Sequence, residues 1–292
     1  MKRLLVGYDG SDPAREAARM AARIAAQLGA GLTVFTVGQI APLVASMTGV
    51  LGPLVDEKLF RTTAEAGAET VRALGVEPEV RVELGDPADR ILQAVDREGY
   101  DLVVVGHRGV GGIAGLILGS VAKRLAETAP CPVLVVRGTA PAAFRKLLVG
   151  IDGSEQAHRA AEVATALAGP SGAEVTLLYA LDPTMLAAVG DDAARRQLRL
   201  ALEKTGRDAL EKAAQVCERA GVAHRTVLAE GRPVEVICKR ARLGGYDLVA
   251  LGRRGMTGLA RFALGSVSDE VLRQVGRPVL LVGERAKKAP LG

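Results

Sequence analysis

Residues 2–11 read KRLLVGYDGS, and residues 145–154 read RKLLVGIDGS. Each copy is a short apolar run that ends in Asp-Gly-Ser, a combination typical of a buried strand followed by a turn. Two further stretches repeat: GYDLV occupies residues 99–103 and 245–249, and CPVLVV at 131–136 returns as RPVLLV at 277–282. The chain is therefore predicted to contain one domain twice.

The repeats set the expected domain boundaries. The chain has 292 residues, and two copies of about 140 residues each have the size of a domain. We expect domain 1 at residues 1–139, domain 2 at residues 144–284 and a C-terminal tail at residues 285–292. Residues 138–143 read GTAPAA and are predicted to form the linker.

Strand-like runs alternate with helical periodicity in both copies. The first copy predicts strands at 3–8, 32–37, 79–83, 101–106 and 132–136, and helices at 13–28, 57–74, 87–98 and 120–128. The second copy predicts strands at 146–151, 174–179, 223–228, 246–251 and 278–282, and helices at 155–168, 191–220, 233–243 and 266–275. Continuous apolar runs, such as LVVV at 102–105, indicate strands that are covered on both faces.

This alternation predicts an α/β fold with right-handed crossovers. We expect two tandem doubly wound, Rossmann-like domains, each a five-stranded parallel sheet with helices on both faces. Ligands of such folds lie beyond the carboxyl ends of the strands, where the strand order reverses. Candidate functional residues are therefore sought at the ends of the strands.

A glycine pattern follows the fourth strand of each copy. The spacing G-x2-G-x9-G-S holds for Gly106, Gly109, Gly119 and Ser120, and again for Gly252, Gly255, Gly265 and Ser266. Glycine lets backbone N–H groups approach a ligand, and the helix that begins at the Gly-Ser pair favours phosphate at its N-terminus. The alternative is a tight loop in which the serine caps the helix. Because a duplication inherits its spacing, the second copy does not decide between the two.

The glycine spacing, together with an aspartate at the end of the first strand, resembles the ATP-binding class of the universal stress protein family. The resemblance covers nearly all of both halves, so the chain resembles a tandem universal stress protein with an adenine-nucleotide alpha-hydrolase-like fold. It implies ATP with Mg at one site in each half. In the first half the implied ATP contacts are Asp9, Gly10, Val37, Gly106, Arg108, Gly109, Gly119, Ser120 and Val121. In the second half they are Asp152, Gly153, Ala180, Gly252, Arg254, Gly255, Gly265, Ser266, Val267 and Ser268.

The resemblance also assigns roles to these residues. Asp9 and Asp152 match an aspartate near the ribose and adenine, where a carboxylate accepts hydrogen bonds from hydroxyl groups. The alternative for Asp-Gly-Ser is a turn and helix cap. Val37 and Ala180 match the backbone position that reads the adenine edge, and the glycine loops match the ribose-triphosphate loop.

The two halves differ where the terminal phosphate is expected. The second half carries Ser268, a hydroxyl of the kind that the family often has there, and the first half carries Ala122. The second loop contains two arginines at 253–254, and the first a His-Arg pair at 107–108. The guanidinium groups either support a triphosphate or face solvent. The second site is predicted to bind ATP more tightly.

The segments after the second strands also differ. The first copy has an apolar loop from Ile40 to Val55, and the second a charged helix from Asp191 to Ala220. We expect these segments to pack against the neighbouring half; the alternative is a lid over the adenine or a surface for a partner.

Composition excludes several classes of protein. The formal charge is +5, with basic residues scattered along the chain, and aromatic residues make up only 3%. A solvated surface is therefore favoured over a nucleic-acid-binding surface. Cys131, Cys217 and Cys238 lie far apart, which argues against disulfides and for a reducing compartment. With no signal peptide and no unbroken apolar run of about 20 residues, we expect a cytoplasmic protein that binds no membrane.

The resemblance to the universal stress protein family implies an ATP-binding module of the stress response or of signalling. The chain lacks P-loop, GxGxxG, HExxH, GxSxG and kinase motifs, and the sequence offers no assigned general base near the expected phosphates. We therefore expect a protein that is not an enzyme. The alternatives are a slow ATPase or autophosphorylating enzyme, and a nucleotide-free partner-binding module.

Partners are expected from the resemblance as well. The resemblance implies that the last strands, near 133–136 and 279–282, meet, so that the two halves pair as a pseudo-dimer. Further homo-dimerisation and a protein partner that the sequence does not name are compatible with this arrangement.

Overall fold

The computed structural model describes residues 1–38, 57–109, 118–187, 189–255 and 264–284. The chain divides into two compact units, Met1–Ala140 (unit 1) and Pro141–Gly292 (unit 2). This division falls within the expected linker at residues 138–143. The apolar loop at residues 40–55 and the C-terminal tail at residues 285–292 lie outside the described residues.

The described part of unit 1 contains a parallel sheet in the order β3-β2-β1-β4-β5. Its strands are β1 (Arg3–Gly7), β2 (Gly31–Gly38), β3 (Glu79–Leu84), β4 (Leu102–Gly106) and β5 (Val133–Val136). Its helices are α1 (Asp12–Leu28), α3 (Glu57–Arg72), α4 (Pro87–Glu98) and α5 (Ser120–Thr128). Since β1 pairs with both β2 and β4, the strand order reverses between β1 and β4.

Unit 2 repeats this topology in the order β10-β9-β6-β7-β8. Its strands are β6 (Lys146–Ile151), β7 (Glu174–Leu181), β8 (His224–Glu230), β9 (Leu248–Gly252) and β10 (Val279–Val282). Its helices are α6 (Glu155–Ala168), the 3₁₀ turn η1 (Gly169–Ser171), α7 (Thr184–Ala187), α8 (Asp192–Arg219), α9 (Pro233–Leu243) and α10 (Ser266–Gln274). The order reverses between β6 and β9.

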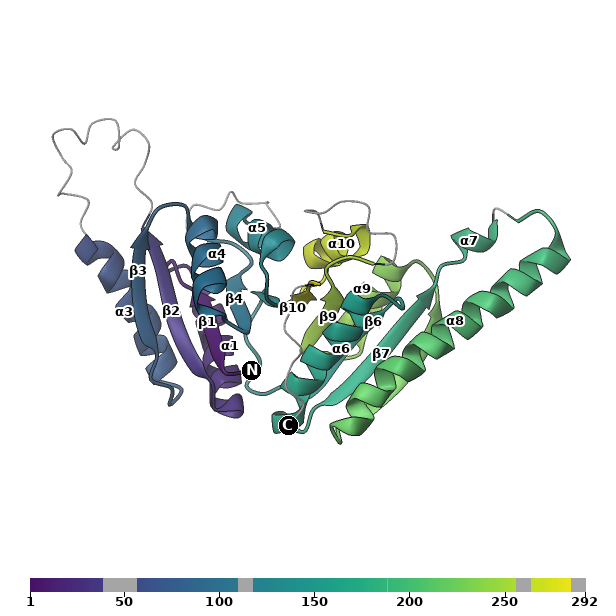
Figure 1. Cartoon of the computed structure of the whole chain (residues 1–292), viewed down its shortest axis with the longest axis horizontal. Helices are drawn as coiled ribbons and strands as arrows, with labels where there is room; N and C mark the ends of the chain where they lie inside the picture. Colours follow the sequence, from purple (N-terminus) through teal and green to yellow (C-terminus); the bar gives the residue numbers. More distant parts are fainter. Residues whose placement is uncertain (39–56, 110–117, 188, 256–263, 285–292) are drawn as a thin grey trace, which may run out of the picture. The chain divides into compact units, whose positions relative to one another are not determined.

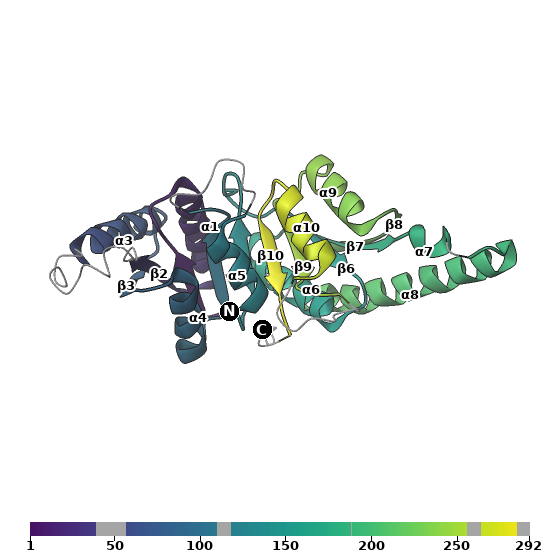
Figure 2. The same cartoon turned by 90° about the horizontal axis from the view of Figure 1, so that it is seen from above.

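Helices cover both faces of each sheet, as Figures 1 and 2 show for each unit by itself. In unit 1, α1 packs with α3 and α4 packs with α5; in unit 2, α6 packs with α8 and α9 packs with α10. The side chains of Leu4, Leu5 and Val6 are fully buried, as expected for a strand between two helical layers. The predicted doubly wound α/β fold is confirmed.

The predicted elements agree with the structure to within a few residues. The short α7 and η1 were not predicted, because one turn of helix is too brief to show periodicity. The Asp182 carboxylate accepts hydrogen bonds from the backbone N–H and hydroxyl of Thr184, at 2.9 and 2.7 Å, and this local turn starts α7.

The Asp-Gly-Ser turns lead into the first helix of each unit. Gly10 and Gly153 have φ of 85° and 89°, a conformation that favours glycine. Ser11 then caps α1 and Ser154 caps α6, each accepting a backbone N–H from the first turn. The turn-and-cap role of these three residues is therefore realised in both units.

The repeated Gly-Tyr-Asp sequence has a structural role. In unit 2, the Asp247 carboxylate accepts the backbone N–H groups of Arg145 and Lys146 at 2.7 and 3.1 Å. The buried Tyr246 hydroxyl donates to Thr176 Oγ1 at 3.0 Å. The equivalent bonds recur in unit 1, so the motif fastens the start of the fourth strand to the first and second strands of each sheet.

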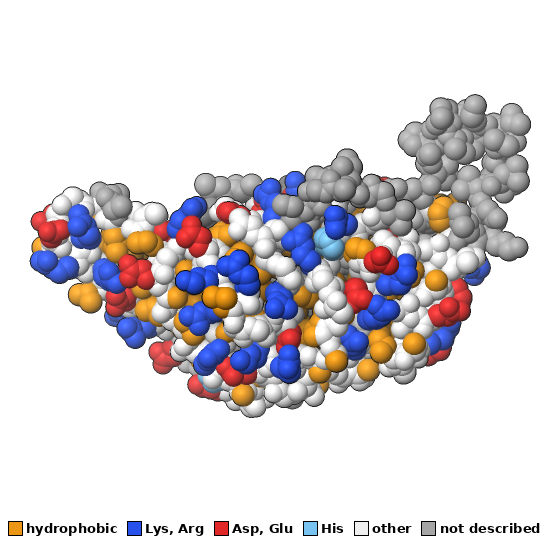
Figure 3. Space-filling view, turned by 180° about the vertical axis from the view of Figure 1, so that it is seen from behind, with side chains coloured by type: hydrophobic (Ala, Val, Ile, Leu, Met, Phe, Trp, Pro, Cys, Tyr) orange, Lys and Arg blue, Asp and Glu red, His pale blue; other side chains and the backbone are white. Residues whose placement is uncertain are grey.

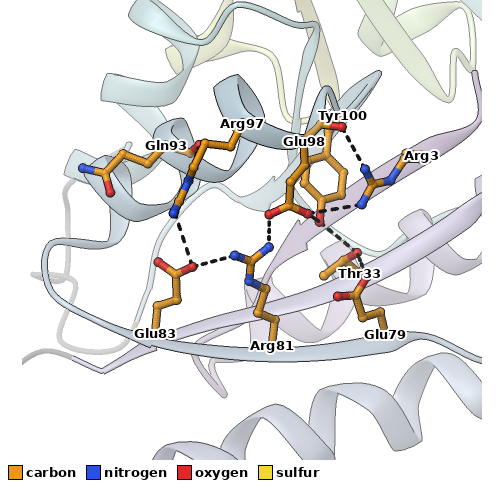
Figure 4. A network of polar contacts seen from close by, with 9 residues as sticks. All are labelled: Arg3, Thr33, Glu79, Arg81, Glu83, Gln93, Arg97, Glu98 and Tyr100. Atoms are coloured by element: carbon orange, nitrogen blue, oxygen red, sulfur yellow. Dashed lines mark hydrogen bonds and ion pairs between the residues drawn. The ribbon is translucent and has the colours of Figure 1, made fainter.

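In unit 1 this fastening extends into a polar network (Figure 4). Arg81 of β3 pairs with Glu83 at 2.9 Å and also with Glu98 at the end of α4. Arg3 donates to Glu98 at 3.2 Å, and its guanidinium lies 4.8 Å from the centre of the Tyr100 ring. The hydrogen bond from Arg81 lowers the pKa of Glu98. The network ties the edge strand β3 to β1.

The charged surface fits the scattered pattern expected from the sequence. Lys and Arg side chains are spread over the face shown in Figure 3, with Asp and Glu side chains among them. Several form exposed ion pairs, such as Arg124 with Asp86 at 3.1 Å. No helix within the described ranges combines the length and apolar character needed to cross a membrane.

Replacing Asp247 by alanine should lower the free energy of unfolding by about 1–2 kcal/mol, because two backbone N–H groups lose a charged acceptor. Urea unfolding followed by circular dichroism measures this change. Asp208→Ala, on the exposed side of α8, is the matched control and should stay within about 0.5 kcal/mol of wild type. Equal effects of the two substitutions would contradict the structural role.

Candidate functional site

The aspartates that follow β1 and β6 face the second glycine of each loop. In unit 2, Asp152 Oδ1 accepts the backbone N–H of Ser154 at 2.9 Å. Its other oxygen, Oδ2, lies so near Gly255 that a Cβ on this residue would stand 2.5 Å from it. Asp9 and Gly109 are in the same contact in unit 1. The carboxylate thus fits only against a glycine.

The first glycine of each loop is required for packing. A Cβ on Gly106 would lie 2.7 Å from the backbone of Pro13 in α1, and one on Gly252 would lie 2.9 Å from Ala157 N in α6. Real Cβ atoms do not approach other atoms so closely. These glycines therefore let the first helix reach the end of the fourth strand, whatever else they contact.

The third glycine starts the next helix. Gly119 and Gly265 occupy the N-cap positions of α5 and α10, and each donates its backbone N–H to a carbonyl at the start of its loop, at 2.8 and 2.9 Å. Ser120 and Ser266 are the first helical residues and make no side-chain cap bond, so the alternative in which these serines cap the helices is not realised. The first N–H groups of each helix are thus left without a side-chain cap.

A cavity of about 420 Å³ in unit 2 opens at the carboxyl ends of β6, β7 and β9. The predicted residues that line it are Asp152, Ala180, Gly252, Arg254, Gly255, Gly265, Ser266, Val267 and Ser268. Gly153 is the one predicted residue of this unit outside its lining. The fold therefore brings together residues from three strand ends and one helix N-terminus.

Sequence reasoning missed most of the apolar wall of this cavity. The apolar wall comprises Tyr179, Leu181, Met185, Leu202, Pro233 and Ile237, from β7, α7, α8 and α9, and Asp182 also lines the cavity. Tyr179 and Leu181 lie at the carboxyl end of β7, so the rule that ligands lie at the carboxyl edge could have suggested them. Which side chains turn inward depends on packing.

The charge of Asp152 acts on Tyr179 in this wall. The pKa of Tyr179 is raised, chiefly by burial and further by the negative charge of Asp152. The cavity thus combines an aromatic and aliphatic wall with the carboxylate residues Asp152 and Asp182.

Ser268 and Arg253 of unit 2 are both buried, but they contact different parts of the backbone. Ser268 is buried, and its hydroxyl donates to the Gly252 carbonyl at 2.7 Å, so its single proton is directed to the backbone. Arg253 is 6% exposed and packs against Gly283, where a Cβ would lie 2.9 Å from its Nη1. Of the two arginines in the loop, Arg254 lines the cavity.

The predicted residues of unit 1 lie on elements equivalent to those of unit 2. Val37 lies near the end of β2, and Val121 lies in the first turn of α5. Arg108 Nε donates to His107 Nε2 at 3.1 Å, and His107 Nδ1 lies 3.3 Å from the Val136 carbonyl oxygen. The pKa of His107 is lowered by burial and by the charges of Arg137 and Arg108. The neutral imidazole therefore accepts a bond from the arginine that corresponds to Arg254.

The sequence profile of the universal stress protein family matches residues 1–137 and 143–283. The chain belongs to the universal stress protein family. A universal stress protein of Mycolicibacterium smegmatis is 31% identical over 97% of both chains, so the tandem arrangement is shared. One from Thermus aquaticus is 40% identical over 47% of this chain and 98% of its own length. The crystal structure of a universal stress protein from Archaeoglobus fulgidus, 21% identical, covers 96% of this chain and 98% of its own with a TM-score of 0.64, which supports the fold.

In this universal stress protein, replacing Arg137 by methionine should raise the pKa of His107 toward its ordinary value. The substitution removes a positive charge that disfavours the protonated imidazole, while burial and Arg108 still hold the pKa below that value. NMR titration of the imidazole protons measures the change, with His107→Gln for assignment. His158, whose pKa is lowered mainly by burial in unit 2, should keep its value. An unchanged pKa of His107 would contradict this account.

Proposed function

We propose that this tandem universal stress protein binds ATP at the carboxyl edge of each sheet, more tightly in unit 2, and acts as a nucleotide-dependent module of the stress response. The observation that carries the proposal is the cavity of about 420 Å³ in unit 2. Its volume lies within the range of small-molecule pockets, about 300–1,000 Å³. An apolar wall and a glycine-rich helix N-terminus that line the same cavity suit a base joined to phosphates.

The residues that line the cavity fall into two groups, one suited to the base and ribose and one suited to the phosphates. The wall formed by Tyr179, Leu181 and Ile237 would accept a flat apolar ring, and the backbone at Ala180 would read its edge. Asp152 would accept hydrogen bonds from ribose hydroxyl groups. This assignment uses the oxygen that faces Gly255, since the other accepts the Ser154 N–H.

The phosphate end is built from backbone and one guanidinium group. The N–H groups around Gly265, Ser266 and Val267 would meet phosphate oxygens at the N-terminus of α10, and Arg254 would add positive charge. No group of three His, Cys, Asp or Glu side chains in the described ranges is arranged to hold a metal ion. Mg would therefore be held by the phosphates.

Unit 1 would use the corresponding residues Asp9, Gly10, Gly109 and Gly119. It is proposed as the weaker site because Arg108 is bonded to His107, which reduces the groups available to a terminal phosphate. Ser268 of unit 2, which corresponds to Ala122, donates its proton to the Gly252 carbonyl and does not decide the difference.

We further propose that ATP is bound without efficient turnover. The carboxylates that line the cavity are Asp152 and Asp182, and each already accepts hydrogen bonds from its own turn. The alternative, a slow ATPase or autophosphorylating enzyme, is tested by following ADP release and phosphate incorporation. The free cysteines among the described residues suit the reducing cytoplasm.

Titration calorimetry of the full chain with ATP and Mg tests the proposal. Wild type should bind ATP, and Asp152→Ala should weaken binding at the tighter site by at least about tenfold, because a hydrogen bond to a charged group is lost. Gly255→Val should have a similar effect, since the added side chain overlaps the Asp152 carboxylate. Asp208→Ala is the control and should bind as wild type does.

Absence of ATP binding to folded wild type would refute the proposal. Native mass spectrometry of the freshly purified protein gives an independent reading, because ATP that is bound and not turned over would appear as an adduct. A nucleotide-free protein in both measurements would favour the alternative of a partner-binding module.

A further inference from the structure

Gln156 is a buried polar side chain beside the candidate site of unit 2. It lies in the first turn of α6 and is 6% exposed. Its Oε1 accepts the backbone N–H of Arg254 at 2.9 Å, and its Nε2 donates to Glu284 Oε1 at 3.2 Å. One amide thus links the glycine loop to Glu284, the second residue after β10.

Unit 1 has no means of making this link. The residue that corresponds to Gln156 is Pro13, which packs against Gly106, and the residue that corresponds to Glu284 is Gly138. The two units therefore hold the equivalent arginine differently. Arg108 is bonded through its side chain to His107, whereas Arg254 is anchored through its backbone by Gln156.

This difference bears on the charge presented to the cavity. A backbone anchor fixes the position of the Arg254 Cα, and Arg254 is one of the residues that line the cavity. A preorganised cation loses less conformational freedom when it meets an anion. The buried amide of Gln156 can therefore strengthen the contact between Arg254 and an anion without touching the anion itself.

We propose that Gln156 is a positioning residue that holds Arg254 for the terminal phosphates, so that unit 2 prefers nucleoside triphosphates over monophosphates. The inference rests on the proposed ATP binding and deepens it. Gln156 acts through Arg254, and the apolar wall and Asp152 are independent of it. Loss of the Gln156 amide should therefore weaken the binding of the β- and γ-phosphates and leave the recognition of base and ribose intact.

The experiment compares the affinities of ATP and AMP by titration calorimetry in the full chain. Gly109→Val is introduced throughout to block unit 1, because its side chain overlaps the Asp9 carboxylate. In this background Gln156→Met should weaken ATP binding by about tenfold and AMP binding by less than about twofold. Gln156→Pro introduces the residue that unit 1 has at the same helical position. It should weaken ATP and AMP binding to the same extents as Gln156→Met.

Three further variants separate positioning from a general structural role. Arg254→Met should reproduce the loss of ATP affinity, and the double variant Gln156→Met with Arg254→Met should lose no more than either single variant. The third variant exchanges the two bridging residues, Gln156→Glu with Glu284→Gln. It keeps the total charge and the side-chain hydrogen bond, in which residue 284 becomes the donor. This exchange should restore the ratio of ATP to AMP affinity.

The outcomes distinguish this inference from the proposed function. If the background protein binds neither nucleotide, the proposed function fails. If it binds both and Gln156→Met weakens ATP and AMP equally, or neither, the positioning role is overturned while ATP binding stands. Additive losses in the double variant, or failure of the exchange to restore the ratio, would also overturn it.

Discussion

The approach of the Asp152 carboxylate to the backbone of Gly255 is the contact on which the candidate site of unit 2 depends. It exists because β6 and β9 are neighbours at the point where the strand order reverses. The turn after β6 holds one carboxylate oxygen, and the glycine leaves room for the other. A second close approach, between Gly252 and the start of α6, brings the helix carrying Gln156 against the same loop. These two contacts fix the polar side of the cavity.

The two units keep this backbone frame and change the side chains placed on it. Arg253 in unit 2 is accommodated by Gly283, whereas unit 1 has His107 and Arg137 at the corresponding positions. In unit 2 a large side chain at the end of β9 is matched by a glycine at the end of β10, whereas unit 1 carries large side chains at both positions. Duplication therefore preserved the geometry that a ligand would need while allowing the charge around it to diverge.

Much of the candidate site could be predicted from local sequence. Strand ends, Asp-Gly-Ser turns and the glycine spacing marked Asp152, the loop glycines and Ser266, because these features depend on backbone conformation. The resemblance to a known family added Arg254 and Ser268. Local sequence left open whether Ser120 and Ser266 cap their helices, since a glycine at the N-cap and a serine one residue later look alike in sequence. Gln156 was overlooked because nothing local marks a helical glutamine as buried.

The sequence by itself determined the duplication, the α/β alternation and the residues at the carboxyl ends of the strands, since periodicity and turn chemistry act over short distances. Only the tertiary structure decided which side chains share a cavity. The wall of Tyr179, Leu202 and Ile237 comes from three elements far apart in the chain. Likewise, the bond from Arg254 to Gln156 spans 98 residues. Such contacts follow from how the helical layers pack on the sheet, and no local pattern records that packing.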